Sequence, residues 1–341
     1  MTSELFKRVD SIIIPNYHNY WVNPIINKYM PGALKSYEGT LILRKNKKAV
    51  FISHPFNYAQ AKKVFGKNTL VVNYNDGKGY GAALKKYCGK KIGFDGKYNS
   101  VNMLKCMKGF FKGRRVKWFN VAKELSENRE IKEVQEVECI KKAVDETIKV
   151  IKKAMAFLHK GVSEIEVEKF FRKEFERDGF ETAFCIVAFG KNASNLHHVP
   201  SETKLQNGEG VLIDVGAKYK GYCADISESS WFGEKSGRVY EEYSNKFIEV
   251  QDSFTKIKKI LKPNTKASDL WAVVKKLKLP HALGHGLGLE EHDIPAGIGA
   301  SSKWKLKEGM VLAIEPGYYT KEFGIRVERN YLITKKGFKE L

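Results

Sequence analysis

The sequence predicts an α+β chain of two domains, a small α/β domain followed by a larger one. Up to about residue 122, short apolar segments alternate with helix-like segments, as expected of an α/β layer. Residues 122–136 are charged and lack a β pattern, and we expect the boundary there, between residues 122 and 123. Long segments with helical periodicity, separated by strand pairs, follow. The length of 341 residues also exceeds what one compact core usually holds.

The individual elements follow from local patterns. Strands are expected in the first domain at residues 11–14, 40–43, 49–52 and 69–72, with a helix at 58–65. In the second domain, apolar residues recur at helical spacing through 140–151. Ser163 and Glu166 form a capping box that starts another helix. A third helix should span 240–261, and a fourth, capped by Ser268, should reach residue 278.

Four carboxylates and one histidine lie in largely apolar stretches of the second domain: Asp214, Asp225, His285, Glu315 and Glu328. A carboxylate in an apolar strand is costly to bury unless it is paired or binds a metal. Surface acids need no apolar neighbours on both sides. This combination of residue types therefore indicates a site for two divalent cations.

Spacing strengthens this interpretation. The segment between Asp214 and Asp225 has the character of a hairpin tip, and a tip centred on residues 219–220 would place the two aspartates directly opposite each other. Glu315 and Glu328 repeat the pattern around residues 321–322. Two hairpins of this kind can converge on a pair of ions, and His285, in a Gly-rich segment, adds a nitrogen ligand.

In this order, the segments resemble the metallopeptidases of the pita-bread fold, which include aminopeptidase P, prolidase and methionine aminopeptidase. The resemblance is strong from about residue 129 onward and implies a pita-bread catalytic domain over 123–341, with residues 1–122 as the N-terminal α/β domain. The motif at residues 324–328 is similar to that of the Xaa-Pro peptidases. So are the segments that contain His197 and His292.

The resemblance implies roles for the site residues. Asp214 would bind one metal, His285 and Glu315 the other, and Asp225 and Glu328 would bridge them. Such ligands suit Mn²⁺, Co²⁺, Fe²⁺ or Zn²⁺, with Mn²⁺ or Co²⁺ preferred, and two ions would activate a water molecule. The proton acceptor would be Glu315, the carbonyl oxygen would be held by His197 and His292, and Arg326 would contact substrate or orient ligands. For His198 and His281 we expect structural or loop roles.

The implied activity is hydrolysis of the bond between an N-terminal residue and proline, in a dipeptide or a longer peptide, by a homodimer. One alternative is a non-catalytic binding module on the same fold that uses its basic surface for nucleic acid or acidic proteins. Another is a metal-free hydrolase of the creatinase type. Relatives of these kinds lose ligands, whereas this chain keeps all five, so we favour the metallopeptidase.

Two positions depart from the family pattern in charge. Glu228 stands where relatives usually have arginine, and Arg329 stands where they often have an acid. Strand alternation places both side chains on the face away from the metal ligands. We therefore expect Glu228 and Arg329 to form an ion pair behind the site. Also, Pro295 is followed by Ala296, where many prolidases have an arginine.

The chain is strongly basic, with a formal net charge of +21 and a pI of about 9.5. The basic residues form small clusters that are separated in the sequence, at 45–48, 62–63, 85–86 and 112–117, without interleaved aromatic residues. We therefore expect a solvated basic surface rather than a nucleic-acid partner.

The remaining composition favours a reducing compartment. There is no apolar run long enough to span a membrane and no signal-peptide pattern, so we expect a cytoplasmic protein without a membrane partner. The five cysteines fit neither a disulfide framework nor a CxxC motif and are expected as thiols. Cys223, two residues before Asp225, is expected on the metal-facing side, as a small space-filling residue rather than a ligand.

Overall fold

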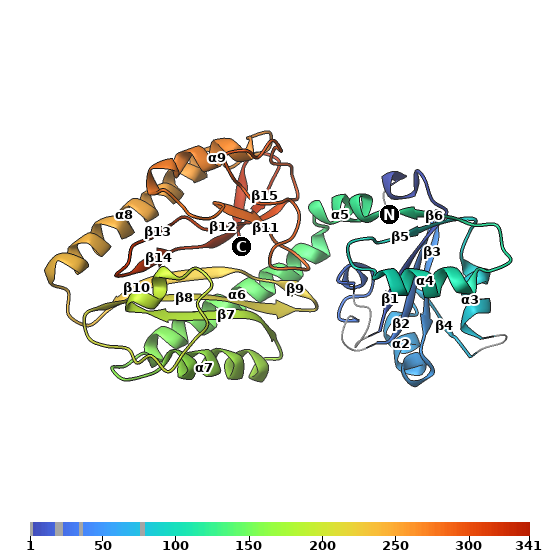
Figure 1. Cartoon of the computed structure of the whole chain (residues 1–341), viewed down its shortest axis with the longest axis horizontal. Helices are drawn as coiled ribbons and strands as arrows, with labels where there is room; N and C mark the ends of the chain where they lie inside the picture. Colours follow the sequence, from blue (N-terminus) through green and yellow to red (C-terminus); the bar gives the residue numbers. More distant parts are fainter. Residues whose placement is uncertain (1–2, 18–22, 34–36, 76–78) are drawn as a thin grey trace. The chain divides into compact units, whose positions relative to one another are not determined.

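The computed structural model describes residues 3–17, 23–33, 37–75 and 79–341. The chain forms two compact units, Met1–Arg129 and Glu130–Leu341 (Figure 1). The boundary expected between residues 122 and 123 falls at the start of helix α5 (Ala122–Glu130), whereas the two units divide near the end of that helix.

The N-terminal unit contains a six-stranded mixed sheet in the order β4-β3-β2-β1-β5-β6. Its strands are β1 (Ser11–Asn16), β2 (Gly39–Arg44), β3 (Lys47–Ser53), β4 (Leu70–Asn73), β5 (Lys91–Phe94) and β6 (Lys117–Asn120). The pairs β1–β2 and β2–β3 are antiparallel, and the pairs β3–β4, β1–β5 and β5–β6 are parallel. The four strands predicted for this part of the chain are therefore confirmed.

Helices cover both faces of this sheet, which explains why its central strands are apolar throughout. The helices are α1 (Ile26–Tyr29), α2 (Tyr58–Phe65), α3 (Tyr80–Tyr87), α4 (Val101–Phe110) and α5, with 3-10 turns at Ser3–Phe6 and Pro55–Asn57. On β1, Ile12 and Ile14 pack into a core with residues of α1, α2 and α5, whereas Ile13 packs with residues of α3 and α4. Successive side chains of β1 thus point to opposite faces of the sheet and pack into two separate apolar layers.

The C-terminal unit has two halves, each a sheet covered by helices. In the first half, α6 (Val134–Phe157) and α7 (Glu164–Arg177) pack on β7 (Glu181–Phe189), β8 (Glu209–Tyr219), β9 (Tyr222–Cys223) and β10 (Ile226–Phe232). In the second half, α8 (Gly237–Ile260) and α9 (Ala267–Val273) pack on β11 (Gly284–Gly286), β12 (Val311–Ile314), β15 (Arg329–Ile333) and β16 (Phe338–Glu340). A two-stranded sheet, β13 (Gly317–Tyr319) with β14 (Gly324–Arg326), lies beside β10 and β8 (Figure 1). Two 3-10 turns, η3 (Gly190–Ser194) and η4 (Lys275–Leu277), complete the unit.

The helix signals of the sequence hold with one exception. Ser163 caps α7, its Oγ accepts from the Glu166 N–H, and the Glu166 carboxylate accepts from the Ser163 N–H, which is the predicted capping box. The helix expected from Ser268 to residue 278 instead begins at Ala267 without a side-chain cap and ends at Val273. A 3-10 turn follows and stops at Lys278, which adopts the left-handed conformation.

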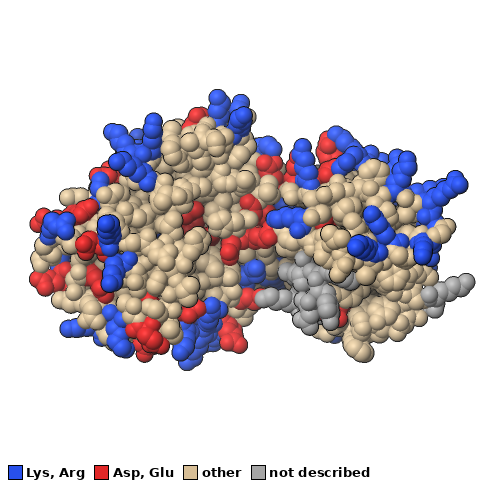
Figure 2. All heavy atoms as spheres, in the orientation of Figure 1, with Lys and Arg blue, Asp and Glu red and all other residues tan. Residues whose placement is uncertain are grey.

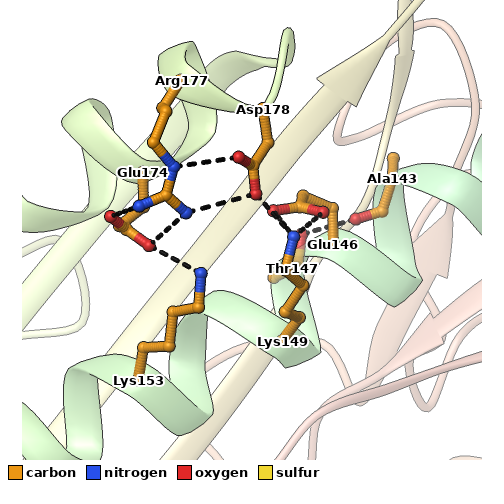
Figure 3. Close-up of polar contacts among 8 residues, drawn as sticks. All are labelled: Ala143, Glu146, Thr147, Lys149, Lys153, Glu174, Arg177 and Asp178. Atoms are coloured by element: carbon orange, nitrogen blue, oxygen red, sulfur yellow. Dashed lines mark hydrogen bonds and ion pairs between the residues drawn. The ribbon is translucent and has the colours of Figure 1, made fainter.

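Ion pairs cross from α6 to the end of α7 (Figure 3). Lys153 Nζ lies 2.7 Å from Glu174 Oε2, and Lys149 Nζ lies 2.5 Å from Asp178 Oδ2. Hydrogen bonds from Arg177 and then from Lys149 hold the pKa of Asp178 below its ordinary value. Because such exposed pairs contribute little individually, the apolar contacts beneath them hold the two helices together. In the described part of the chain, no helix has the length and apolar character that a membrane span requires.

Candidate metal centre

The two predicted aspartates lie on one hairpin but not opposite each other. Asp214 is in the middle of β8, and Asp225 is in the short segment between β9 and β10. Ser227 is the residue that pairs with Asp214, so in the same register Asp225 aligns with Gly216. The prediction of directly opposed aspartates is therefore wrong, and the two residues are diagonal neighbours.

The cause of this shift is the turn between β8 and β9. Lys220 and Gly221 form a two-residue turn in which both have positive φ, 50° and 89°. This is the backbone that a tight hairpin prefers, and glycine adopts it without strain. The tip therefore lies one residue later than predicted. One residue at the tip moves the register by two, so Asp214 and Asp225 still share one face of the hairpin.

The second hairpin agrees with the prediction. On β13 and β14, Gly317 pairs with Arg326, and on β12 and β15, Ile314 pairs with Arg329. Both pairs keep the same register, which places Glu315 across from Glu328. The Thr320 N–H donates to the Phe323 carbonyl across the even-length tip at 2.9 Å.

The two hairpins and β11 converge on a cavity of about 280 Å³. Its wall includes all five predicted ligands, together with His197, His292 and Arg326. Three groups of ligand atoms lie close enough to hold an ion: Asp214, Asp225 and Glu328; His285, Glu315 and Glu328; and Asp225, His285 and His292. Glu328, Asp225 and His285 each belong to two of these groups.

The electrostatics of the cavity fit divalent cations. Burial is the main reason why the pKa values of Asp225 and Glu315 lie well above their ordinary values, and the negative charge of Glu328 is the second reason. The pKa of Glu328 is raised to about 7, mainly by burial and secondly by the negative charge of Asp214. One oxygen of Asp214 and one of Glu328 are buried without a hydrogen-bond partner. Bound cations would stabilise these carboxylates, which lie close together and are not all hydrogen-bonded.

His285 has the contacts and the lowered pKa expected of a histidine that binds a metal in its neutral form. Its Nδ1 lies 3.1 Å from the Gly286 carbonyl, which leaves Nε2 facing Asp225 Oδ2 at 3.5 Å and Glu315 Oε1 at 3.7 Å. The pKa of His285 is lowered to about 4, mainly by burial and secondly by the electrostatic effect of His292. The ring of His292 stacks on that of His285, with centroids 3.9 Å apart. His292 therefore lies beside the expected ligands and also lines the cavity, and its contact with the substrate carbonyl stays a prediction.

His197 reaches the cavity on a loop that a single buried carboxylate organises. Glu164, at the first position of α7, has a fully buried side chain. It accepts hydrogen bonds from both sides of this loop: from Phe189 N, Asn192 Nδ2, Ser201 N and Ser201 Oγ, with His198 Nε2 at 2.8 Å. The expected structural role of His198 follows from this contact. His197 itself is exposed on the cavity side of the loop.

Comparison with known proteins agrees with this geometry. Residues 138–335 match metallopeptidase family M24, and residues 9–131 match the creatinase/prolidase N-terminal domain. The chain belongs to metallopeptidase family M24. Curated relatives include uncharacterized peptidases of Staphylococcus epidermidis, 34% identical over 65% of each chain, and of Staphylococcus aureus, 33% identical over 62% of each chain. The chain thus spans less than two thirds of the length of these relatives.

Solved structures are similar to this chain over nearly its whole length. An X-Pro aminopeptidase from Thermotoga maritima has a TM-score of 0.87 at 24% identity, covering 97% of this chain and 95% of that one. An Xaa-Pro dipeptidase from Bacillus anthracis has a TM-score of 0.84 at 25% identity, covering 97% and 92%. A prolidase from Pyrococcus horikoshii has a TM-score of 0.82 at 27% identity, covering 97% and 93%. The predicted fold, a pita-bread domain preceded by a smaller α/β domain, is confirmed.

One further histidine, His281, lies on the wall of the M24 cavity, and Tyr319 contacts it. His281 lines the cavity, its Nε2 lies 3.0 Å from Tyr319 Oη, and its Nδ1 lies 2.7 Å from the Ala282 carbonyl and 3.6 Å from Glu315 Oε2. Burial lowers the pKa of His281 to about 4. We had expected a structural or loop histidine, although His281 precedes His285 by four residues and that spacing was a usable signal. Tyr319 likewise follows Glu315 by four residues.

Arg326 connects these side chains to the ligands. Its guanidinium is buried and lies 2.5 Å from Asp214 Oδ2, and it donates to Tyr319 Oη at 3.2 Å and to Ser227 Oγ at 3.1 Å. Ser227 Oγ in turn donates to Glu328 Oε2 at 2.9 Å. Arg326 therefore contacts Asp214 directly and Glu328 through Ser227, and its expected role in orienting ligands or contacting substrate stays a prediction.

The buried thiol of Cys223 packs in the apolar core of the first half, with Sγ 3.9 Å from the Leu289 carbonyl. It belongs to no group of potential ligands among the described residues. The thiol therefore fills space in the core, but the expected position on the metal-facing side is wrong, since Cys185, on β7, lines the cavity and Cys223 does not.

Proposed function

We propose that this M24 chain uses two divalent ions to hydrolyse the peptide bond between an N-terminal residue and proline. The observation that carries the proposal is the convergence of four carboxylates and His285 on one cavity that also contains His197, His281 and Arg326. Likeness to an Xaa-Pro dipeptidase and a prolidase over nearly the whole chain supports the substrate class.

The ligand groups are consistent with a dinuclear arrangement. Asp214 would hold one ion, His285 and Glu315 the other, and Asp225 and Glu328 would serve both. The bridging role of Glu328 is supported by its membership in both the group with Asp214 and the group with His285 and Glu315, and Asp225 lies within reach of Asp214 in one group and of His285 in another. Ions at these positions would polarise the scissile carbonyl and make a bound water more acidic. Oxygen donors with one imidazole favour Mn²⁺ or Co²⁺, with Fe²⁺ and Zn²⁺ also compatible.

The chain's own side chains would handle the proton and the developing charge. Glu315 is the carboxylate that takes the proton of the attacking water, since it lies on the cavity wall and is only partly exposed. His197 and His292 would donate to the carbonyl oxygen as it gains negative charge. Arg326 fixes Asp214 and, through Ser227, Glu328, so the ligands are positioned before substrate arrives.

A panel of matched peptides tests the proposal. Metal-stripped protein, reloaded with Mn²⁺ or Co²⁺, would be assayed on Xaa-Pro dipeptides, longer Xaa-Pro peptides and the same peptides with alanine in place of proline. Metal-dependent release of the N-terminal residue from the proline peptides alone is expected. Cleavage of the alanine peptides with none of the proline peptides would show a different specificity, and the two peptide lengths distinguish a dipeptidase from an aminopeptidase. The homodimer and the cytoplasmic location remain predictions.

A further inference from the structure

The charge of the chain is concentrated in the N-terminal unit. Residues 1–129 contain 25 Lys and Arg against 7 Asp and Glu, whereas residues 130–341 contain 35 against 32. The N-terminal unit therefore carries most of the net charge of +21. Figure 2 shows the same contrast, with few acidic side chains among the basic ones on the visible face of this unit.

The fold brings separated basic segments to one edge of the N-terminal sheet. In the register of β1, Ser11 pairs with Arg44 on one side and with Ile92 on the other. Lys91 pairs in turn with Lys117. The β2–β3 turn and the starts of β5 and β6 therefore lie at the same end of the strands. The strands from β3 to β6 span about 19 Å at the usual strand spacing.

Side-chain contacts join three of these segments into a continuous surface. Arg114 donates to the carbonyls of Lys85 and Cys88, which links the segment before β6 to the segment before β5. The guanidinium of Arg44 lies 5.7 Å from the ring centroid of Tyr87, and Lys86 Nζ lies 5.3 Å from the same centroid. We call residues 44–48, 85–91 and 112–117 together the basic edge.

Most cations of the basic edge have no role in holding the unit together. Among those that are exposed and form no ion pair within the described residues are Lys45, Lys47, Lys90, Lys91, Lys112, Arg115 and Lys117. The nearby Asp10 accepts from the backbone N–H groups of Lys90 and Lys91 instead. Lysines in the last turn of α3 complement the helix dipole, but this does not account for cations in a hairpin turn or at strand starts. Their mutual repulsion is unfavourable without an anionic partner.

We propose that the basic edge binds the sugar-phosphate backbone of a nucleic acid. A line of cations about 19 Å long can contact several successive phosphates of a nucleic acid. A small anion, in contrast, would contact only two or three of these cations. A nucleic acid is favoured over a lipid surface, because the three segments expose no large apolar side chain that would add insertion into the bilayer to the attraction of the charges. Contacts from cations to phosphates carry no sequence information, so binding is expected to be independent of sequence.

The test uses charge-neutralising substitutions at four exposed positions, Lys47→Gln, Lys90→Gln, Lys91→Gln and Arg115→Gln, combined in one variant of the full chain. Fluorescence anisotropy would measure binding to labelled oligothymidine and to a labelled duplex over a range of salt concentrations. Wild type is expected to bind at about 50 mM salt, with affinity that falls steeply as salt rises. The variant should lose at least about tenfold in affinity, and its salt slope on oligothymidine should be lower by about 3.

A matched variant removes the same formal charge from the C-terminal unit through Lys152→Gln, Lys169→Gln, Lys256→Gln and Lys303→Gln, all at exposed positions. Its affinity should stay within about twofold of wild type. Circular dichroism melts would establish that both variants are folded. Equal losses in the two variants, or no binding by wild type at low salt, would overturn the proposal. So would edge-dependent binding to phosphatidylglycerol vesicles without binding to either oligonucleotide.

Discussion

Arg329 Nη2 lies 2.5 Å from Glu228 Oε1, on the strands next to the predicted metal ligands Asp225 and Glu328. The pair joins β15 to β10, and Arg329 also donates to the carbonyls of Ser227 and Glu328. It confirms the ion pair expected from two charge reversals. Because Asp225 precedes β10 and Glu328 precedes β15, the pair holds together the two strands whose carboxylates would share both ions.

Reversing either charge should loosen this connection. Glu228→Arg or Arg329→Glu alone should destabilise by about 1 kcal/mol, which would lower Tm by about 2–4 °C. The double reversal should recover at least half of that loss, although the bonds from Arg329 to the two carbonyls would not return. Thermal melts of the four proteins measure this coupling. Strictly additive effects would mean that the two side chains do not interact in solution.

The bridging role of Asp225 and Glu328 predicts a joint loss of metal and activity. Asp225→Asn or Glu328→Gln removes a ligand from two groups at once, so metal content should fall below about two ions per chain. Loss of groups that merely support ligands costs about 10–100-fold, so activity here should fall by about 100-fold or more. Mass spectrometry of metal content and peptide assays measure the two effects. Asp252→Asn, on the exposed face of α8, is the control and should change neither.

His197 should separate catalysis from metal binding. It belongs to none of the ligand groups within the described residues but lines the cavity. His197→Ala should therefore retain the wild-type metal content and lose about 10²–10³-fold in kcat, as expected for a donor to the developing oxyanion. A fall in metal content that parallels the fall in kcat would instead assign His197 to the ligands.

Glu164 should link the stability of the His197 loop to pH. Burial would raise its pKa, but hydrogen bonds from Ser201, His198 and Asn192 outweigh burial and lower it. A lowered folded-state pKa contributes stability above the unfolded value, and this contribution is lost as pH falls through the folded value. Glu164→Gln should therefore cost about 2–4 kcal/mol at neutral pH, and the difference from wild type should shrink below about pH 4.3.

The same variant should lower kcat without a change in metal content, because the loop that carries His197 loses its anchor. Glu176→Gln, at an exposed position of α7, is the matched control and should leave unfolding and kcat near wild type. A pH-independent difference between wild type and Glu164→Gln would show that the carboxylate charge does not matter there.

Local patterns predicted the ligands because each lies in a short apolar segment with a recognisable hairpin. The register at Glu315 and Glu328 followed from an even loop length. The register at Asp214 and Asp225 differs from the prediction because Gly221 fixes a tight turn one residue later in the chain than expected.

Other features depend on contacts between distant segments. The bonds of Glu164 connect α7 to residues 189–201, and Arg326 contacts Asp214 across more than one hundred positions. The sequence of a single segment does not predict such networks, because their members come from distant parts of the chain. The basic edge has the same origin, since its clusters are separated in the sequence and meet only when β1, β2, β5 and β6 align. A sequence scan for local clusters therefore underestimated it.

The central claim is that two ions held by five side chains support cleavage before proline. The most direct measurement is a titration of metal-stripped protein with Mn²⁺, in which bound metal and the initial rate of hydrolysis of an Xaa-Pro peptide are followed together. The rate should rise from the baseline and reach its plateau at about two ions per chain, with no rise in Asp225→Asn. Full activity in the metal-stripped protein, or a plateau unaffected by Asp225→Asn, would contradict the claim.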